Sequence, residues 1–101
     1  MGFFRNTKIT NMAFQISYKG MKLMSSMRNT DPEMAPSAEE AIENLGDELA
    51  VIARDFCFTE KERACVLKGL KQGLKAYGLS QTAILNIVAK LTQRIMAGTL
   101  V

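Results

Sequence analysis

The sequence predicts a mainly α-helical fold, a small bundle of at least three helices preceded by an N-terminal strand, hairpin or mobile arm. The chain has 101 residues, enough for one modest domain. From residue 37 onward, apolar residues recur at three- and four-residue spacings, which is typical of amphipathic helices. Pro32 and Pro36 disfavour helix just before that point. We therefore divide the chain into a basic, strand-like or partly mobile arm at residues 1–30 and a helical domain at residues 31–101.

The first predicted helix spans residues 38–57. Ser37 and Glu40 form a capping box, in which the serine hydroxyl accepts a hydrogen bond from the N–H three residues later and the glutamate reaches back. An apolar stripe follows at helical spacing: Ile42, Leu45, Leu49, Ile52 and Phe56. We expect this stripe to face the core.

The second predicted helix begins after Thr59, which forms another capping box with Glu62. It ends at Gly78, because glycine adopts the positive φ of a helix C-terminus without steric cost. Gly69 and Gly73, four residues apart, create a smooth patch where another backbone could approach closely. Its apolar stripe is Leu67, Leu70, Leu74 and Tyr77.

The third predicted helix runs from the cap at Ser80 to Gly98. It is apolar over a wide arc, so we expect one side to face the core and a second side to bind a partner. The expected interface is Leu85, Val88, Thr92 and Met96. Across the three helices, the expected core residues are Leu45, Leu49, Ile52, Phe56, Leu67, Leu70, Leu74, Ile84, Val88, Leu91 and Ile95.

Residues 1–30 show a different pattern. Apolar residues alternate with others at Met12, Phe14, Ile16 and Tyr18, and a period of two favours a strand. Gly20 would turn the chain, and residues 21–27 would return as a second strand or begin a helix. Six of the seven methionines fall within the first 34 residues, and methionine suits adaptable surfaces. The segment also permits readings as a basic arm toward nucleic acid or an anionic membrane, or as a transit peptide.

Charge is distributed unevenly along the chain. Residues 1–30 hold five bases and no acid, and residues 31–58 hold eight acids against Arg54 alone. Residues 59–101 hold seven bases against Glu60 and Glu62. This layout predicts either internal charge complementarity or two basic surfaces flanking an acidic one.

The composition argues against catalysis. The chain has no histidine, the commonest general base and metal ligand, and no nucleophile–base pair or phosphate-binding glycine loop can be named. We therefore expect no enzyme activity, no cofactor, no metal and no small-molecule substrate. Cys57 and Cys65 are expected to be free thiols in the reducing cytoplasm. No apolar run approaches the roughly 20 residues that span a membrane, so we expect no membrane partner.

Residues 70–91 resemble a helix-turn-helix, with Gly78 as the turn glycine, Leu79 after it, and Ile84 and Ile87 as anchors. On that reading Gln81, Thr82 and Asn86 would face base edges. The DNA phosphates would be contacted by Lys71, Lys75, Lys90 and Arg94. The leading hypothesis is a regulatory or adaptor protein that binds another protein, with a homodimer as one form. The alternative is a helix-turn-helix transcriptional regulator that binds DNA.

Overall fold

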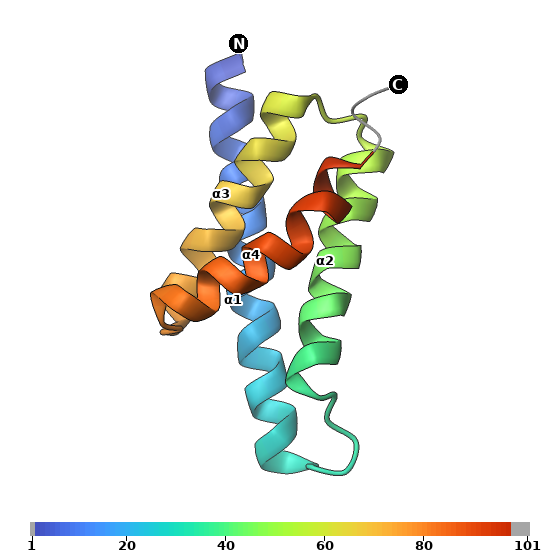
Figure 1. Ribbon diagram of the computed structural model, residues 1–101, viewed down its shortest axis with the longest axis vertical. Coiled ribbons are helices and arrows are strands. Elements are labelled where there is room, and N and C mark those ends of the chain that lie inside the picture. The colour runs from blue at the N-terminus through green and yellow to red at the C-terminus, as the bar shows by residue number, and fades with distance from the viewer. Residues whose placement is uncertain (1, 98–101) are drawn as a thin grey trace.

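The structure is a computed structural model that describes residues 2–97, with side chains from residue 5 onward. It contains four helices joined by short loops (Figure 1). They are α1 (Gly2–Thr30), α2 (Ala38–Asp55), α3 (Glu60–Tyr77) and α4 (Gln81–Met96). No strand occurs within residues 2–97. The mainly helical bundle expected from the sequence is therefore confirmed.

The predicted capping residues begin α2, α3 and α4. The hydroxyl of Ser37 accepts from the backbone N–H of Glu40 at 3.1 Å. Both halves of the capping box are present at Thr59 and Glu62. Gly78 ends α3 with a φ of 109°, and its N–H donates to the carbonyls of Leu74 and Lys75. The expected end of the last helix at Gly98 lies outside the described residues.

The strand or hairpin predicted within residues 1–30 is wrong. Residues 12–18 lie in the middle of α1, a helix of 29 residues. The segment that shows the period-two alternation also contains part of a helical stripe of small and apolar residues at four-residue steps. All residues of this stripe are buried: Ile9, Ala13, Ser17 and Met21. Since alanine and serine are weak hydrophobic signals, this stripe is hard to see in the sequence.

The smooth patch predicted at Gly69 and Gly73 is where α3 packs on α1. A Cβ added to Gly69 would lie 2.2 Å from the carbonyl oxygen of Thr10 and 2.7 Å from the Cβ of Ala13. A Cβ added to Gly73 would lie 2.7 Å from the Cβ of Ser17. The two backbones are thus in contact because both glycines lack side chains, which fixes α1 against α3.

The core lies among all four helices, and α4 crosses α2 and α3 on the front of the molecule (Figure 1). The expected core residues that are buried are Leu45, Leu49, Leu70, Leu74, Ile84, Val88, Leu91 and Ile95, while Ile52 and Leu67 are half-buried. Phe56 is 66% exposed, so its core prediction is wrong. The reason is that α2 ends at Asp55, two residues before the predicted Cys57, and Phe56 leaves the helical stripe.

Arg63 joins the C-terminal ends of two helices from a buried position. Its guanidinium donates to the carbonyl oxygens of Ile95 at 2.8 Å and Ala97 at 2.7 Å, at the end of α4. It also donates to Phe58 at 3.1 Å and Ala53 at 3.4 Å, at the end of α2. Helix ends carry unpaired carbonyls and partial negative charge, so this cation stabilises both.

Candidate functional site

Two hollows lie between α1 and α2, and no residue of α4 lines either of them. α1 packs most extensively on α3, and it makes fewer contacts with the antiparallel α2. The C-terminal half of α1 extends past α3 and α4 beside the start of α2 (Figure 1). This leaves apolar surface on α1 and α2 that the other two helices do not cover.

One hollow of about 370 Å³ opens between the N-terminal half of α1 and the end of α2. Its walls are apolar, and Arg5 and Lys8 stand at its edge. Phe56 is exposed here because α2 has already ended. The apolar lining is Ile9, Met12, Ile52, Phe56 and Phe58.

A second hollow of about 430 Å³ lies toward the other end of the same helix pair. Leu23, which is 62% exposed, lines it together with Met24 and Met27 of α1. From α2 it is lined by Leu45 and Glu48, among others. We call the surface formed by the two hollows the α1/α2 groove. The sequence reasoning missed it because a strand at residues 12–18 would have no such face.

The two edges of the α1/α2 groove carry opposite charge. On α1 the edge carries Lys8 and Lys19, which are eleven residues apart and therefore project from the same side about three turns apart. On α2 the edge carries Glu48 and Asp55, which are two turns apart. All four side chains are exposed. Within the described part of the chain, Asp55 pairs with Arg54 at 3.8 Å, while Lys8, Lys19 and Glu48 form no ion pair.

Arg5 and Glu62 close the upper end of the groove. Arg5 forms an ion pair with Glu62 and lies over the ring of Phe58, 5.9 Å from its centroid. The pKa of Glu62 lies below its ordinary value because the backbone N–H of Thr59 donates to its carboxylate at 2.8 Å, and Arg5 adds to this effect. The carboxylate is therefore held ionised, and it ties the start of α1 to the start of α3.

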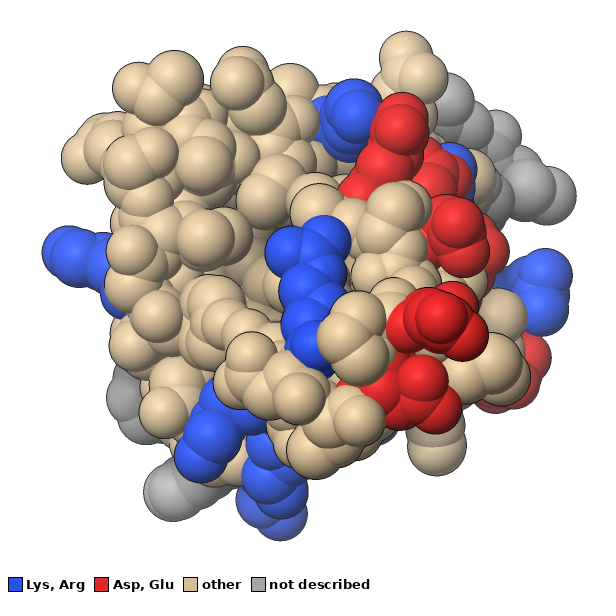
Figure 2. Space-filling model, turned by 90° about the horizontal axis from the view of Figure 1, so that it is seen from below, with Lys and Arg blue, Asp and Glu red and all other residues tan. Residues whose placement is uncertain are grey.

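The view along the long axis shows the acids gathered on one side of the molecule (Figure 2). This side belongs to α2, whose sequence contains Glu39, Glu40, Glu43, Asp47 and Glu48. A broad area of the opposite side in that view is uncharged (Figure 2). The molecule therefore presents distinct surfaces rather than an even mixture of charges.

The interface expected on α4 does not form one exposed apolar patch. Leu85 is 53% exposed, but Val88 is buried in the core. Thr92 and Met96 are half-buried, and the hydroxyl of Thr92 donates to the carbonyl of Val88. Leu85 is thus the main exposed apolar side chain of that set.

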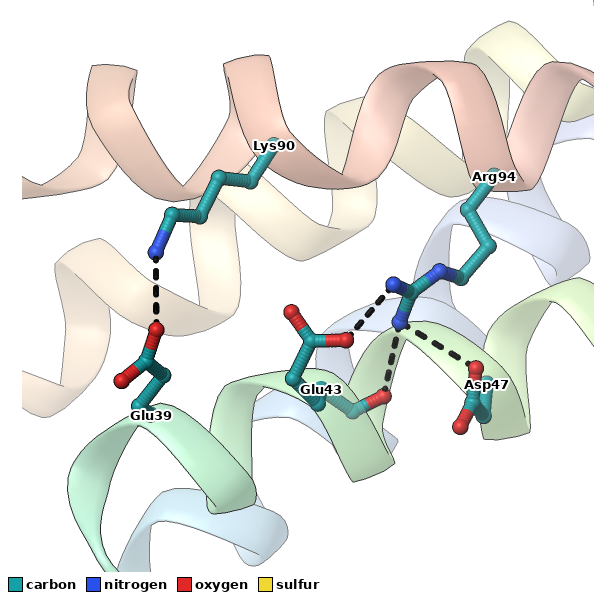
Figure 3. Close-up of polar contacts among 5 residues, drawn as sticks. All are labelled: Glu39, Glu43, Asp47, Lys90 and Arg94. Atoms are coloured by element: carbon teal, nitrogen blue, oxygen red, sulfur yellow. Dashed lines mark hydrogen bonds and ion pairs between the residues drawn. The ribbon is translucent and has the colours of Figure 1, made fainter.

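The residues expected to contact nucleic acid fall into two groups. Lys71, Lys75, Gln81, Thr82 and Asn86 are exposed around the α3–α4 corner. Lys90 and Arg94 instead face the acidic side of α2 (Figure 3).

The ion pairs between α2 and α4 are specific (Figure 3). Lys90 lies 3.9 Å from Glu39, and Arg94 lies 2.6 Å from Glu43 and 3.1 Å from Asp47. The pKa of Arg94 lies above its ordinary value, first because Glu43 accepts its hydrogen bond. The internal charge complementarity predicted from the sequence therefore holds between these two helices.

The described residues contain no group of three or more His, Cys, Asp or Glu arranged to hold a metal ion. Cys57 is an exposed free thiol and Cys65 a half-buried one. No described helix combines the length and apolar character needed to cross a membrane.

The chain matches no protein-family model, no curated protein and no solved structure.

Proposed function

We propose that the protein acts by binding another protein, as a regulatory or adaptor protein, and that it has no catalytic role. The observation that supports this most is the α1/α2 groove. Its two apolar hollows include Leu23 and Phe56, which are large hydrophobic side chains exposed to solvent. Exposed apolar surface of this kind marks interaction sites on protein domains.

The shape of the groove suits a helix of the partner. It follows α2, whose 18 residues give it a length of about 27 Å at about 1.5 Å per residue. An amphipathic helix laid along it would place apolar side chains at three- and four-residue steps into the two hollows. Met12, Met24 and Met27 line these hollows and adapt their shape to the ligand. The charged edges would set the direction of the bound helix.

The proposal favours protein binding over DNA binding for an electrostatic reason. Two of the four bases expected to meet phosphates, Lys90 and Arg94, are already paired with carboxylates of α2. A row of acids beside α4 would also repel the phosphate backbone. The proposal places the protein in the cytoplasm, where reducing conditions would keep Cys57 and Cys65 as thiols.

Site-specific photo-crosslinking in the cell that makes the protein tests this function. A photoreactive residue at position 23 samples the groove, and one at position 85 samples another exposed leucine position, on α4. We expect protein adducts from position 23 and few from position 85, with mass spectrometry identifying the partner. Absence of any protein adduct at position 23 would contradict the proposal.

A further inference from the structure

We propose that the α1/α2 groove binds a second copy of this chain, with the two copies related by a two-fold axis that runs along the groove. This inference rests on the proposed function, because it takes the groove as the binding surface. It goes further by naming the partner and its orientation. The arrangement of charge along the groove supports both.

The opposite charges on the two edges lie at similar heights. α1 and α2 are antiparallel (Figure 1), so the start of α1 lies beside the end of α2. Lys8 borders the same hollow as Phe56, which follows Asp55 in sequence. Lys19 precedes Gly20, and Gly20 lines the other hollow together with Glu48. Eleven residues of α1 rise about 16 Å and seven residues of α2 rise about 10 Å, so Lys8 lies within about one turn of the height of Asp55, and Lys19 within about one turn of the height of Glu48.

A two-fold axis along the groove makes this pattern self-complementary. It places α1 of one copy opposite α2 of the other without changing any height. Lys19 then faces Glu48 of the second copy, and Lys8 faces Asp55 of the second copy. Because the interface is isologous, each pairing occurs twice. A two-fold axis across the groove would instead place α1 opposite α1, with base against base and acid against acid, which is unfavourable.

The apolar parts of the groove suit the same arrangement. In the proposed dimer, α1 and α2 of both copies form four helices in which each neighbour is antiparallel, as in a four-helix bundle. The two hollows of one copy would face those of the other, at the same heights. Leu23 and Phe56 would become buried, and the methionines would fill the remaining gaps.

Sedimentation equilibrium of charge-reversed variants tests the orientation. Lys19→Glu and Glu48→Lys each create two like-charge pairs in the proposed dimer, so each should raise its dissociation constant about tenfold or more. The double variant Lys19→Glu/Glu48→Lys restores two opposite-charge pairs, so its dissociation constant should return toward that of the natural chain. Far-UV circular dichroism of each variant checks that it is folded. A double variant that dissociates more readily than either single variant would overturn the proposed axis.

A pair of leucine variants tests the surface. Leu23→Glu should produce a monomer, while Leu85→Glu, which alters another exposed leucine, on α4, should leave the dimer intact. The reverse result would place self-association on α4 and overturn the inference. A natural chain that stays monomeric at every concentration would also overturn it. If position 23 still crosslinks to a different protein in that case, the proposed function stands without the second copy; if it crosslinks to none, both fail.

Discussion

Replacing Gly69 by alanine probes the close approach of α3 to α1. The new Cβ would lie 2.2 Å from the carbonyl oxygen of Thr10 and 2.9 Å from the backbone nitrogen of Phe14. Both atoms belong to the backbone of α1, so they cannot rotate away as the end of a side chain would. Gly69→Ala therefore requires α1 to move away from α3.

Two opposing effects set the size of the change. Alanine favours a helix interior over glycine by about 1 kcal/mol. Overpacking a tight contact costs about 1–3 kcal/mol, and contact with backbone belongs at the upper end of that range. We therefore expect Gly69→Ala to lower the free energy of unfolding by about 2 kcal/mol, the difference between these effects.

Gly20→Ala is the matched control on α1. Its added Cβ would have Leu45 Cδ1 as its nearest neighbour, at 3.9 Å, an ordinary van der Waals contact. Without overpacking, this variant should gain about 1 kcal/mol of stability from helix propensity alone. Both variants are measured by urea unfolding followed by circular dichroism, at one protein concentration because self-association shifts apparent stability. If Gly69→Ala stabilises the protein as Gly20→Ala does, α1 is not packed on α3 as described.

Three further substitutions test other parts of the account. Arg63→Leu should lower the free energy of unfolding, measured by urea unfolding, by about 3 kcal/mol, because it leaves carbonyls at the end of α4 without a donor. An unchanged free energy would contradict the role of Arg63. Glu62 has a pKa below its ordinary value of 4.5, so its stabilising contribution is complete above that pH and is lost as the pH falls through the lower folded value. Glu62→Gln should therefore reduce the loss of free energy of unfolding as the pH is lowered. If the variant and the natural chain show the same pH dependence of this free energy, the role of Glu62 is contradicted. Ser17 is fully buried, and its hydroxyl has no hydrogen-bond partner among the described residues. Ser17→Ala should therefore raise the free energy of unfolding, measured by thermal unfolding, by about 1 kcal/mol. A decrease would show that the hydroxyl has a partner.

Local signals in the sequence account for α2, α3 and α4. Each begins at a serine or threonine whose hydroxyl accepts a backbone N–H three residues later, and this interaction involves only neighbours in the chain. Gly78 ends α3 for an equally local reason. Phe56 shows the limit of the periodic pattern, because an apolar residue in register falls outside the core once the helix has ended.

The first helix depends on contacts that are distant in sequence. The apolar alternation from Met12 to Tyr18 is real, but the buried face of α1 consists of small residues that fit the glycines of α3. The glycine patch was visible in the sequence, whereas its partner was not. The α1/α2 groove could not be predicted for the same reason, since it exists only when residues 1–30 form a helix beside α2.

The methionine methyl groups provide the most direct test of the proposed binding surface. Met12, Met24 and Met27 line the α1/α2 groove, while Met34 is exposed in the loop after α1 and Met96 lies on α4. NMR spectra of isotope-labelled methionine methyl groups, recorded over a dilution series, report which of these become covered as two copies associate. We predict concentration-dependent shifts for Met12, Met24 and Met27, with Met34 and Met96 unchanged. Shifts at Met96 alone, or at none of the five, would contradict a second copy bound in the groove.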